Sequence, residues 1–472
     1  MSNRKFFYIL PVFLLLLGSQ HLYAQYQLTR SDTTFVIDNI HISGNKHTKS
    51  KIILREIELK KGDTVYLHQL LHKIKKSRQN LINRSLFNTV EITPKRHDFN
   101  KVDLYVAVTE RWYIWPIPIL SYADRNFNVW WEKKDFSRVN YGINLQINNF
   151  RGRMEKLNII LQGGYDKTLK LDWKIPYINK KEKWGIEIFG GASFNHETDY
   201  KLQNNKLVYF HEEKRYAKKT FIGQVKATFR PKYYFTHSFT LSFNHEEYGD
   251  TLLKLNPYFA YSKHRFSYLS LEYNFKYDYR DYAPYPLNGF YAEADIQQNG
   301  LGIFSKEINL FRFYLIFDQY IPLQKRWYFA YSLSTQVIPN TYQPYFIQNG
   351  LGYRPMGLRG YQLYVIRGNW IGQFRTNVKF AIFPKKSYIL DFIKTEKFNR
   401  FFFGLYANVF LDGAYAANRT PERDHSFLNN RFLWGAGVGL DFVTFYDVVI
   451  RAEYVINRNH EHHFFLSFVA PI

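Results

Sequence analysis

Long stretches of the chain alternate between apolar and polar residues. In FSYLSLEYNFKYDYR, residues 266–280, one face carries Leu269, Leu271, Tyr273, Phe275 and Tyr277, and the other carries Ser270, Glu272, Asn274, Lys276 and Asp278. Side chains of a β-strand alternate between its two faces, so this pattern predicts a strand with one apolar and one polar side. The same alternation returns near residues 373–382 and 448–456.

The alternating segments recur from residue 138 to the end of the chain. Candidate strands begin near residues 138, 154, 168, 184, 217, 235, 254, 266, 288, 305, 325, 371, 400, 430, 446 and 462. Sixteen is an even number, as bacterial membrane barrels require, and strands of about ten residues suit a bilayer. A soluble β-sandwich also alternates, but it does not repeat the pattern over so long a stretch. The pattern therefore predicts a β-rich fold, a sixteen-stranded antiparallel transmembrane β-barrel over 138–472.

Residues 35–110 show a different pattern. Strands are expected over 35–42, 86–93 and 102–109, and apolar residues at helical spacing predict a short helix near Ile53 and a longer one from Leu67 to Ile82. The order β-α-α-β-β predicts one small α+β domain, whose sheet edge can accept an extended peptide. Residues 111–137 are expected to be a linker into the barrel.

The N-terminus indicates export. Arg4 and Lys5 precede the apolar run from Phe6 to Leu17, which is typical of a secretory signal peptide over 1–24. The alternative, a membrane anchor, needs about 18 or more apolar residues. No later segment is long and apolar enough to span a bilayer as a helix, so any membrane span of the exported chain must be made of strands.

Composition agrees with this interpretation. Aromatic residues make up 19% of the chain, yet the mean hydropathy is −0.38, as expected for strands with lipid on one side and water on the other. The chain has no cysteine, so disulfides do not stabilise it. The net charge of +24 can indicate nucleic acid, but for an exported chain we expect outer-membrane lipid head groups and no nucleic-acid partner.

One motif, GLRGY, lies in the long insertion 338–370. Gly357 and Gly360 allow a tight turn, Arg359 carries a permanent cation, and Tyr361 follows. A tight tip that presents a cation implies an acidic socket; the alternative is an exposed arginine at a loop tip.

Together these motifs resemble a known family. ISGNKHTKSKIILREIELKKGD and SLFNTVEI are similar to a POTRA domain, and a C-terminal barrel with GLRGY in its longest loop is similar to the BamA/TamA superfamily of outer-membrane insertases and secretion transporters. The resemblance implies that this loop folds into the lumen and that Arg359 pairs with Asp412 in FLDGAY. It also places Asp278 and Arg280 on the lumen wall as a structural pair.

The resemblance implies a function at a lateral seam between the first and last strands. We expect this seam to join 139–148 with 462–469, marked by Tyr141, Gly142, Phe464 and Phe468, and to template the folding of client barrels. Implied partners are unfolded outer-membrane client proteins, accessory lipoproteins and periplasmic chaperones, with the POTRA domain in the periplasm of a bacterial outer-membrane protein. The alternatives are a two-partner-type polypeptide secretion transporter and a passive porin.

Other chemistry is weakly supported. His460, Glu461, His462 and His463 offer zinc-ligand types, but His462 and His463 point to opposite faces of a strand. GAGVGL, residues 435–440, has the glycine spacing of a phosphate-binding loop, but no helix pattern follows it. Glycines that make room for the inserted loop explain it better. We expect no catalytic residues, no metal and no cofactor, and therefore no enzyme.

Overall fold

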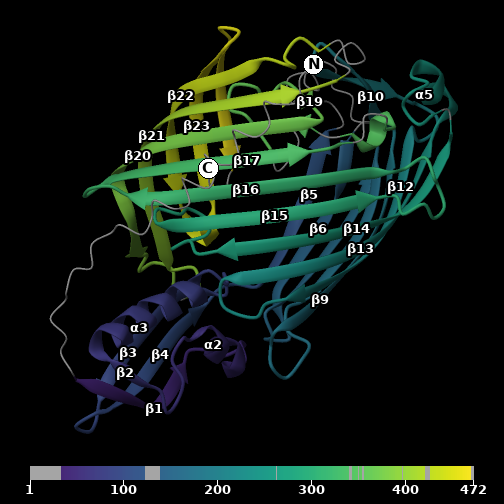
Figure 1. The fold of residues 1–472 in the computed structure, drawn as a ribbon. Helices are drawn as coiled ribbons and strands as arrows, with labels where there is room; N and C mark the ends of the chain where they lie inside the picture. The colour runs from purple at the N-terminus through teal and green to yellow at the C-terminus, as the bar shows by residue number, and fades with distance from the viewer. Residues whose placement is uncertain are drawn as a thin grey trace, which may run out of the picture.

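The computed structural model describes residues 33–122, 139–261, 263–339, 343–348, 350–352, 356–395, 397–419 and 426–468. The expected signal peptide, residues 1–24, lies outside the described residues, as does part of the expected linker. A small α+β domain lies at one end of a large β-barrel (Figure 1). Within the described ranges, no helix is long and apolar enough to cross a membrane.

The N-terminal domain is a four-stranded sheet with two helices. Its elements are β1 (Thr34–Ser43), α2 (Ser50–Glu56), β2 (Thr64–Tyr66), α3 (Leu67–Ile82), β3 (Phe87–Arg96) and β4 (Lys101–Glu110). The strand order is β2-β1-β4-β3, and β1 runs parallel to β4. Ile52 and Ile53 of α2 and Leu70 and Leu81 of α3 join the sheet residues in one buried apolar core. The short strand β2, between the helices, is absent from the expected β-α-α-β-β order, because three residues are too few to show alternation.

The barrel is a single antiparallel sheet of sixteen strands, as predicted. Chain neighbours are also sheet neighbours, apart from the two insertions that contain strands of their own. The wall strands are β5 (Ile114–Tyr122), β6 (Val139–Phe150), β7 (Glu155–Gly164), β8 (Lys167–Ile175), β9 (Trp184–Asn195), β12 (Lys218–Phe229), β13 (Phe235–Tyr248), β14 (Arg265–Asp278), β15 (Gly289–Asn299), β16 (Leu310–Pro322), β17 (Trp327–Val337), β20 (Trp370–Ile389), β21 (Arg400–Ala417), β22 (Phe432–Val443), β23 (Val449–Asn457) and β24 (His462–Phe468).

Two of the expected strand assignments are wrong, and their errors cancel in the count. The first wall strand is β5, which pairs with β6 within the range expected as a linker; its two prolines concealed it, because proline is uncommon in strands. The barrel therefore begins at Ile114 and not at residue 138. The segment expected to start a strand near residue 254 belongs instead to helix α5 (Asp250–Leu255), since a short apolar run does not distinguish strand from helix.

The end of the barrel opposite the N-terminal domain carries the insertions. They are the hairpin β10 (Glu197–Gln203) and β11 (Lys206–His211), helix α5, and the segment between β17 and β20 that holds the 3-10 helix η3 (Tyr345–Ile347), β18 (Gly350–Leu351) and β19 (Ile366–Arg367). Figure 1 shows β10 and α5 close together at this end. Leu202, Leu252, Phe259, Tyr345 and Val365 belong to one buried apolar cluster that ties the three insertions together.

Candidate functional site

The insertion between β17 and β20 brings Arg359 to Asp412 on β21. Arg359 Nε donates to Asp412 Oδ2 at 2.7 Å, and Nη2 donates to Oδ1 at 2.5 Å. Arg359 is 4% exposed and Asp412 is fully buried. A planar guanidinium matches a carboxylate in this two-bond geometry, so the contact fixes orientation as well as charge.

Two further wall strands and an aromatic ring complete the socket. Arg359 Nη2 also donates to the backbone oxygen of Thr376 on β20 at 2.9 Å, and Nη1 reaches Glu453 Oε1 on β23 at 3.5 Å. The guanidinium lies 3.7 Å from the ring centre of Phe410, two residues before Asp412. Phe410 and Asp412 share one face of β21, because side chains of a strand alternate.

The backbone of the loop tip lies directly on the wall. Gly360 has a φ of +88°, and its carbonyl oxygen accepts a hydrogen bond from Asn457 Nδ2 at 2.8 Å. On β22, a Cβ at Gly435 would lie 2.0 Å from the carbonyl oxygen of Arg359, so only glycine fits there. Gly357 has no heavy atom within 4 Å of a built Cβ, so a glycine is not sterically required at that position.

The motif's aromatic residue also contacts the wall. Tyr361 is 2% exposed, its hydroxyl donates to the Trp434 carbonyl at 3.3 Å, and it accepts from the Arg458 backbone N–H. Nearby, Tyr364 donates to Glu461 Oε1 at 2.6 Å. Glu461 of the histidine-rich segment therefore holds the inserted loop to the wall.

The Arg359–Asp412 pair belongs to a larger buried charge network. Arg451 donates to Asp441 at 2.6 and 3.1 Å, and Arg375 Nε lies 3.7 Å from Asp412 Oδ2. Tyr285, from the connection between β14 and β15 at the opposite end of the barrel, donates to Asp441 Oδ2 at 2.8 Å. The inserted loop and this connection therefore meet the same strip of wall, β20 to β23. The sequence shows that Arg451 and Glu453 lie on one face of β23. It does not show how β23 is aligned with β21.

Asp278 and Arg280 lie elsewhere. Arg280 donates to Asp278 at 2.8 and 2.6 Å, and the Arg280 carbonyl accepts from Asn83 of the N-terminal domain at 3.3 Å. This pair therefore orders the edge of the barrel where the N-terminal domain contacts it.

The end strands of the sheet differ from those expected. Tyr141 and Gly142 lie in β6, which pairs with both β5 and β7, so they are not in the first strand. Phe464 and Phe468 lie in β24, which pairs with β23. The two end strands are therefore β5 and β24, and no paired register joins them within the described parts of the chain.

The N-terminal domain is held to the barrel by a buried carboxylate. Glu56 of α2 is fully buried and accepts from Arg230 Nη1 at 2.5 Å and Nη2 at 2.9 Å, in the turn between β12 and β13. Burial alone would raise the pKa of Glu56, but the charges of Arg230, Arg84 and Arg55 outweigh it and lower the pKa to about 2.

Two more contacts hold other parts of the domain to the rim. Arg111 donates to Asp447, in the turn between β22 and β23, at 2.7 and 3.0 Å. Asn149, near the end of β6, donates to Thr48 Oγ1 at 2.8 Å. The three contacts lie at separated places along the rim, so the domain sits across the rim and is not held by one strand alone (Figure 1).

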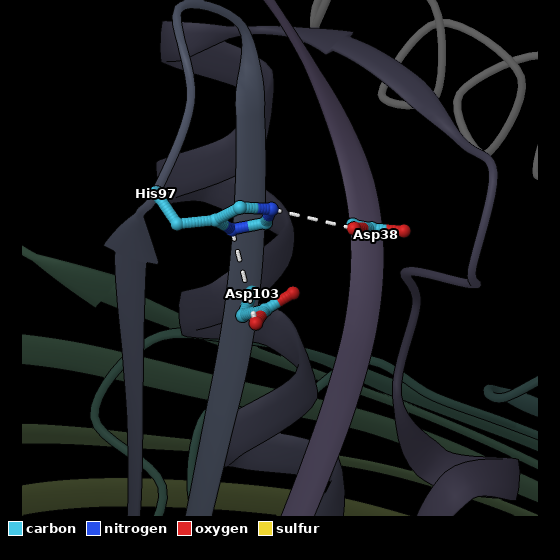
Figure 2. A group of neighbouring side chains, drawn as sticks. All are labelled: Asp38, His97 and Asp103. Atoms are coloured by element: carbon cyan, nitrogen blue, oxygen red, sulfur yellow. Dashed lines mark ion pairs between the residues drawn. The ribbon is translucent and has the colours of Figure 1, made fainter.

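A separate group of side chains lies at the other end of the same domain. His97 Nε2 is 3.3 Å from Asp38 Oδ2 and His97 Nδ1 is 3.8 Å from Asp103 Oδ2 (Figure 2). The three offer oxygen and nitrogen atoms close enough for a metal ion. However, the two ring nitrogens face different carboxylates, which is the geometry of a histidine that bridges two acidic side chains, and His97 is exposed while Asp38 is partly exposed.

Comparison with known proteins identifies the class. Residues 35–111 match the POTRA family described as surface antigen variable number repeat, and residues 149–363 match the Omp85 superfamily domain. A search of curated protein sequences gives no significant match. The chain is a β-barrel protein with an N-terminal POTRA domain. It belongs to the Omp85 superfamily.

Solved structures agree at the level of fold. BamA from Haemophilus ducreyi lacking POTRA domains 1–3 is 15% identical, with 92% of this chain and 83% of that chain covered and a TM-score of 0.50. CdiB from Escherichia coli is 12% identical, with 92% and 74% covered and a TM-score of 0.55. These identities are low, so the likeness concerns the fold alone.

Proposed function

We propose that this protein is an assembly factor of the bacterial outer membrane, which templates the folding of client barrel proteins at the seam between β5 and β24. In this proposal the POTRA domain lies in the periplasm and receives unfolded clients. The observation that carries the proposal is that the two end strands, β5 and β24, do not pair with each other in the described residues.

The physical argument concerns unpaired backbone groups. In lipid, each backbone N–H or C=O without a partner costs several kcal/mol, so an open strand edge attracts any extended chain that can pair with it. An incoming strand of a client satisfies the edge and gains its own ladder of hydrogen bonds. The chain shows no nucleotide-binding motif, so the free energy of client folding is the proposed driving force.

The inserted loop supports this function by blocking the alternative path. Arg359, Tyr361 and Ile366 are buried against the wall or within the loop's own cluster, and the POTRA domain lies across the other end. A barrel that is filled by its own loop and covered at one end favours work at its side over free passage through its centre. The Arg359 socket would hold this closed arrangement.

A second candidate function, polypeptide secretion through the lumen, is favoured by one observation. Between wall strands β8 and β17 the barrel holds a cavity of about 330 Å³ lined by charged side chains, among them Lys226, Glu272, Lys276, Glu293 and Arg312. A charged chamber suits a polar chain in transit. This route requires the inserted loop to leave its socket, whereas seam templating does not.

A reconstitution experiment separates the two. The full chain in liposomes is mixed with a small outer-membrane barrel protein unfolded in urea, and folding is followed by the client's resistance to protease. Assembly activity predicts faster client folding than in empty liposomes. No acceleration, together with passage of an unfolded polypeptide into the liposome interior, would support secretion instead.

A further inference from the structure

The outer face of strands β6 to β9 carries an open groove of about 540 Å³, at the end of the barrel where the insertions lie. We infer that this groove and the residues next to it bind a glycolipid that carries acyl chains and a phosphate on a sugar head group. The inference goes beyond the assembly function and does not depend on it. It requires only that the POTRA domain lies in the periplasm, so that the opposite end of the barrel meets the outer leaflet.

Small residues between large apolar ones form the groove. Strand alternation places Tyr141, Leu161 and Leu169 on the outer face, where they are 63%, 48% and 56% exposed. Gly163 lies directly opposite Tyr141 and has no side chain, so the Tyr141 ring lies 3.7 Å from the place of a Cβ. On the other side of the groove, Leu169 lies opposite Ala192. A depression with apolar walls on a lipid-facing surface suits one hydrocarbon chain.

A lysine lies at the end of the groove nearest the insertions. Lys167 lines the groove and lies opposite Phe194. None of the ion pairs among the described residues includes Lys167. The adjacent carboxylate of Asp166 accepts a hydrogen bond from the His196 backbone N–H at 2.8 Å instead. A lysine ammonium is a compact cation that binds phosphate, so a phosphate is expected directly beyond the acyl chain.

The neighbouring strands add positive charge at the same level. Lys219 of β12 also lies opposite Phe194. Lys219 and Arg265 of β14 share one carboxylate, Glu247 of β13, at 3.1 and 3.2 Å. With Lys167 this row of outward-facing residues holds three cations for one carboxylate, so it complements an anionic head group.

A run of aromatic rings continues from the groove toward the tip of the barrel. The ring centre of Tyr216 lies 5.4 Å from that of Phe194 and 4.5 Å from that of His196. Tyr165 follows, 4.7 Å from His196 and 5.6 Å from the exposed ring of His211. Aromatic faces carry partial negative charge and attract the C–H groups of a sugar ring. A plain phospholipid has no group for this surface.

The three features follow one another in the order of the parts of such a lipid. The apolar groove corresponds to an acyl chain, Lys167 to a phosphate and the aromatic run to a sugar. This order along one side of the barrel selects a phosphorylated glycolipid over other lipids.

Titration of the full chain with defined lipids in detergent micelles, followed by native mass spectrometry, tests the inference. The probes are lipid A, dephosphorylated lipid A and phosphatidylglycerol. The variants are Lys167→Ala, Gly163→Leu and His211→Ala. Lys232→Ala, at an exposed position in the turn between β12 and β13, and Gly223→Leu, on β12 with no heavy atom within 4 Å of a built Cβ, are the matched controls. Folding of each variant is checked by its resistance to unheated detergent.

Lipid A should bind more weakly to each test variant. We expect a loss of about five-fold in Lys167→Ala, the upper range of an exposed ion pair. Gly163→Leu should lose about ten-fold, because the new side chain displaces about two methylene groups from the groove. His211→Ala should lose about three-fold for lipid A and leave phosphatidylglycerol binding unchanged. The two controls should stay within about two-fold of the wild type.

The phosphate is tested separately. Dephosphorylated lipid A should bind the wild type about five-fold more weakly than lipid A and should not respond to Lys167→Ala. Equal lipid A binding by the wild type, Lys167→Ala and Gly163→Leu would show only non-specific lipid contact and overturn the inference. Phosphatidylglycerol that binds as tightly as lipid A would overturn the assigned lipid class. Neither result affects the assembly function, which the folding of client proteins measures independently.

Discussion

Removal of the Arg359 side chain should release the inserted loop from the barrel wall. In Arg359→Ala, Asp412 remains fully buried and loses both of its short hydrogen bonds. Leaving one partner of a buried ion pair uncompensated costs about 3–5 kcal/mol. Arg375 lies 3.7 Å from Asp412 and can compensate in part, so we expect the lower end, about 3 kcal/mol.

That free energy corresponds to an increase of about a hundred-fold in the loop's opening constant. Hydrogen exchange of the full chain in detergent micelles measures this opening constant. Ile366 of β19 is the reporter, because β19 pairs with β18 within the loop. Arg359→Lys keeps the charge but loses the two-bond geometry, so it should give an intermediate effect. Arg431→Ala, at an exposed position, is the matched control.

A double-mutant cycle tests the origin of the effect. Arg359→Ala and Asp412→Ala together should cost clearly less than the sum of the single changes, because each removes the other's uncompensated charge. If Arg359→Ala opens the loop no more than Arg431→Ala does, or if the two changes add, then the ion pair does not hold the loop and this reasoning is wrong.

Further predictions concern the POTRA contact and the loop's seat. The pKa of Glu56 is lowered from 4.5 to about 2, so its contribution to docking, about 3 kcal/mol, is fully present above pH 4.5 and is lost as the pH falls toward 2. Glu56→Gln should weaken docking at neutral pH and remove this acid dependence, measured by protease release of the POTRA domain between pH 3 and 7. Gly435→Ala should displace the loop tip, because its Cβ would collide with the Arg359 carbonyl oxygen, whereas Gly357→Ala has room for its methyl group; hydrogen exchange of the loop should rise only in Gly435→Ala, and equal exchange in both variants would contradict the assigned seat.

The sequence predicted the architecture because barrel strands repeat a period of two many times. Individual strands were less secure. The segment WPIPIL falls within the expected linker, yet the structure places it in β5, the edge strand; its prolines make a strand difficult to predict from sequence. There proline is tolerated, since its missing N–H faces no neighbour. The rule that concealed the strand also accounts for its position.

The site was partly visible for a similar reason. Arg359 and Asp412 lie in short motifs that a family resemblance connects, so they could be paired without a structure. Glu453 and Phe410 complete the socket through strand register, and Glu56 meets Arg230 through the placement of one domain on another. Neither register nor domain placement follows from local sequence patterns, because both depend on how distant segments are aligned.

The central claim is that the protein assembles other barrel proteins, and its depletion from cells tests that claim most directly. Quantitative proteomics of the outer membrane should then show loss of a defined set of barrel proteins, restored by the wild-type chain and not by Arg359→Ala. An unchanged outer-membrane proteome, with a single exported polypeptide or solute no longer crossing, would contradict the claim and identify the barrel as a conduit.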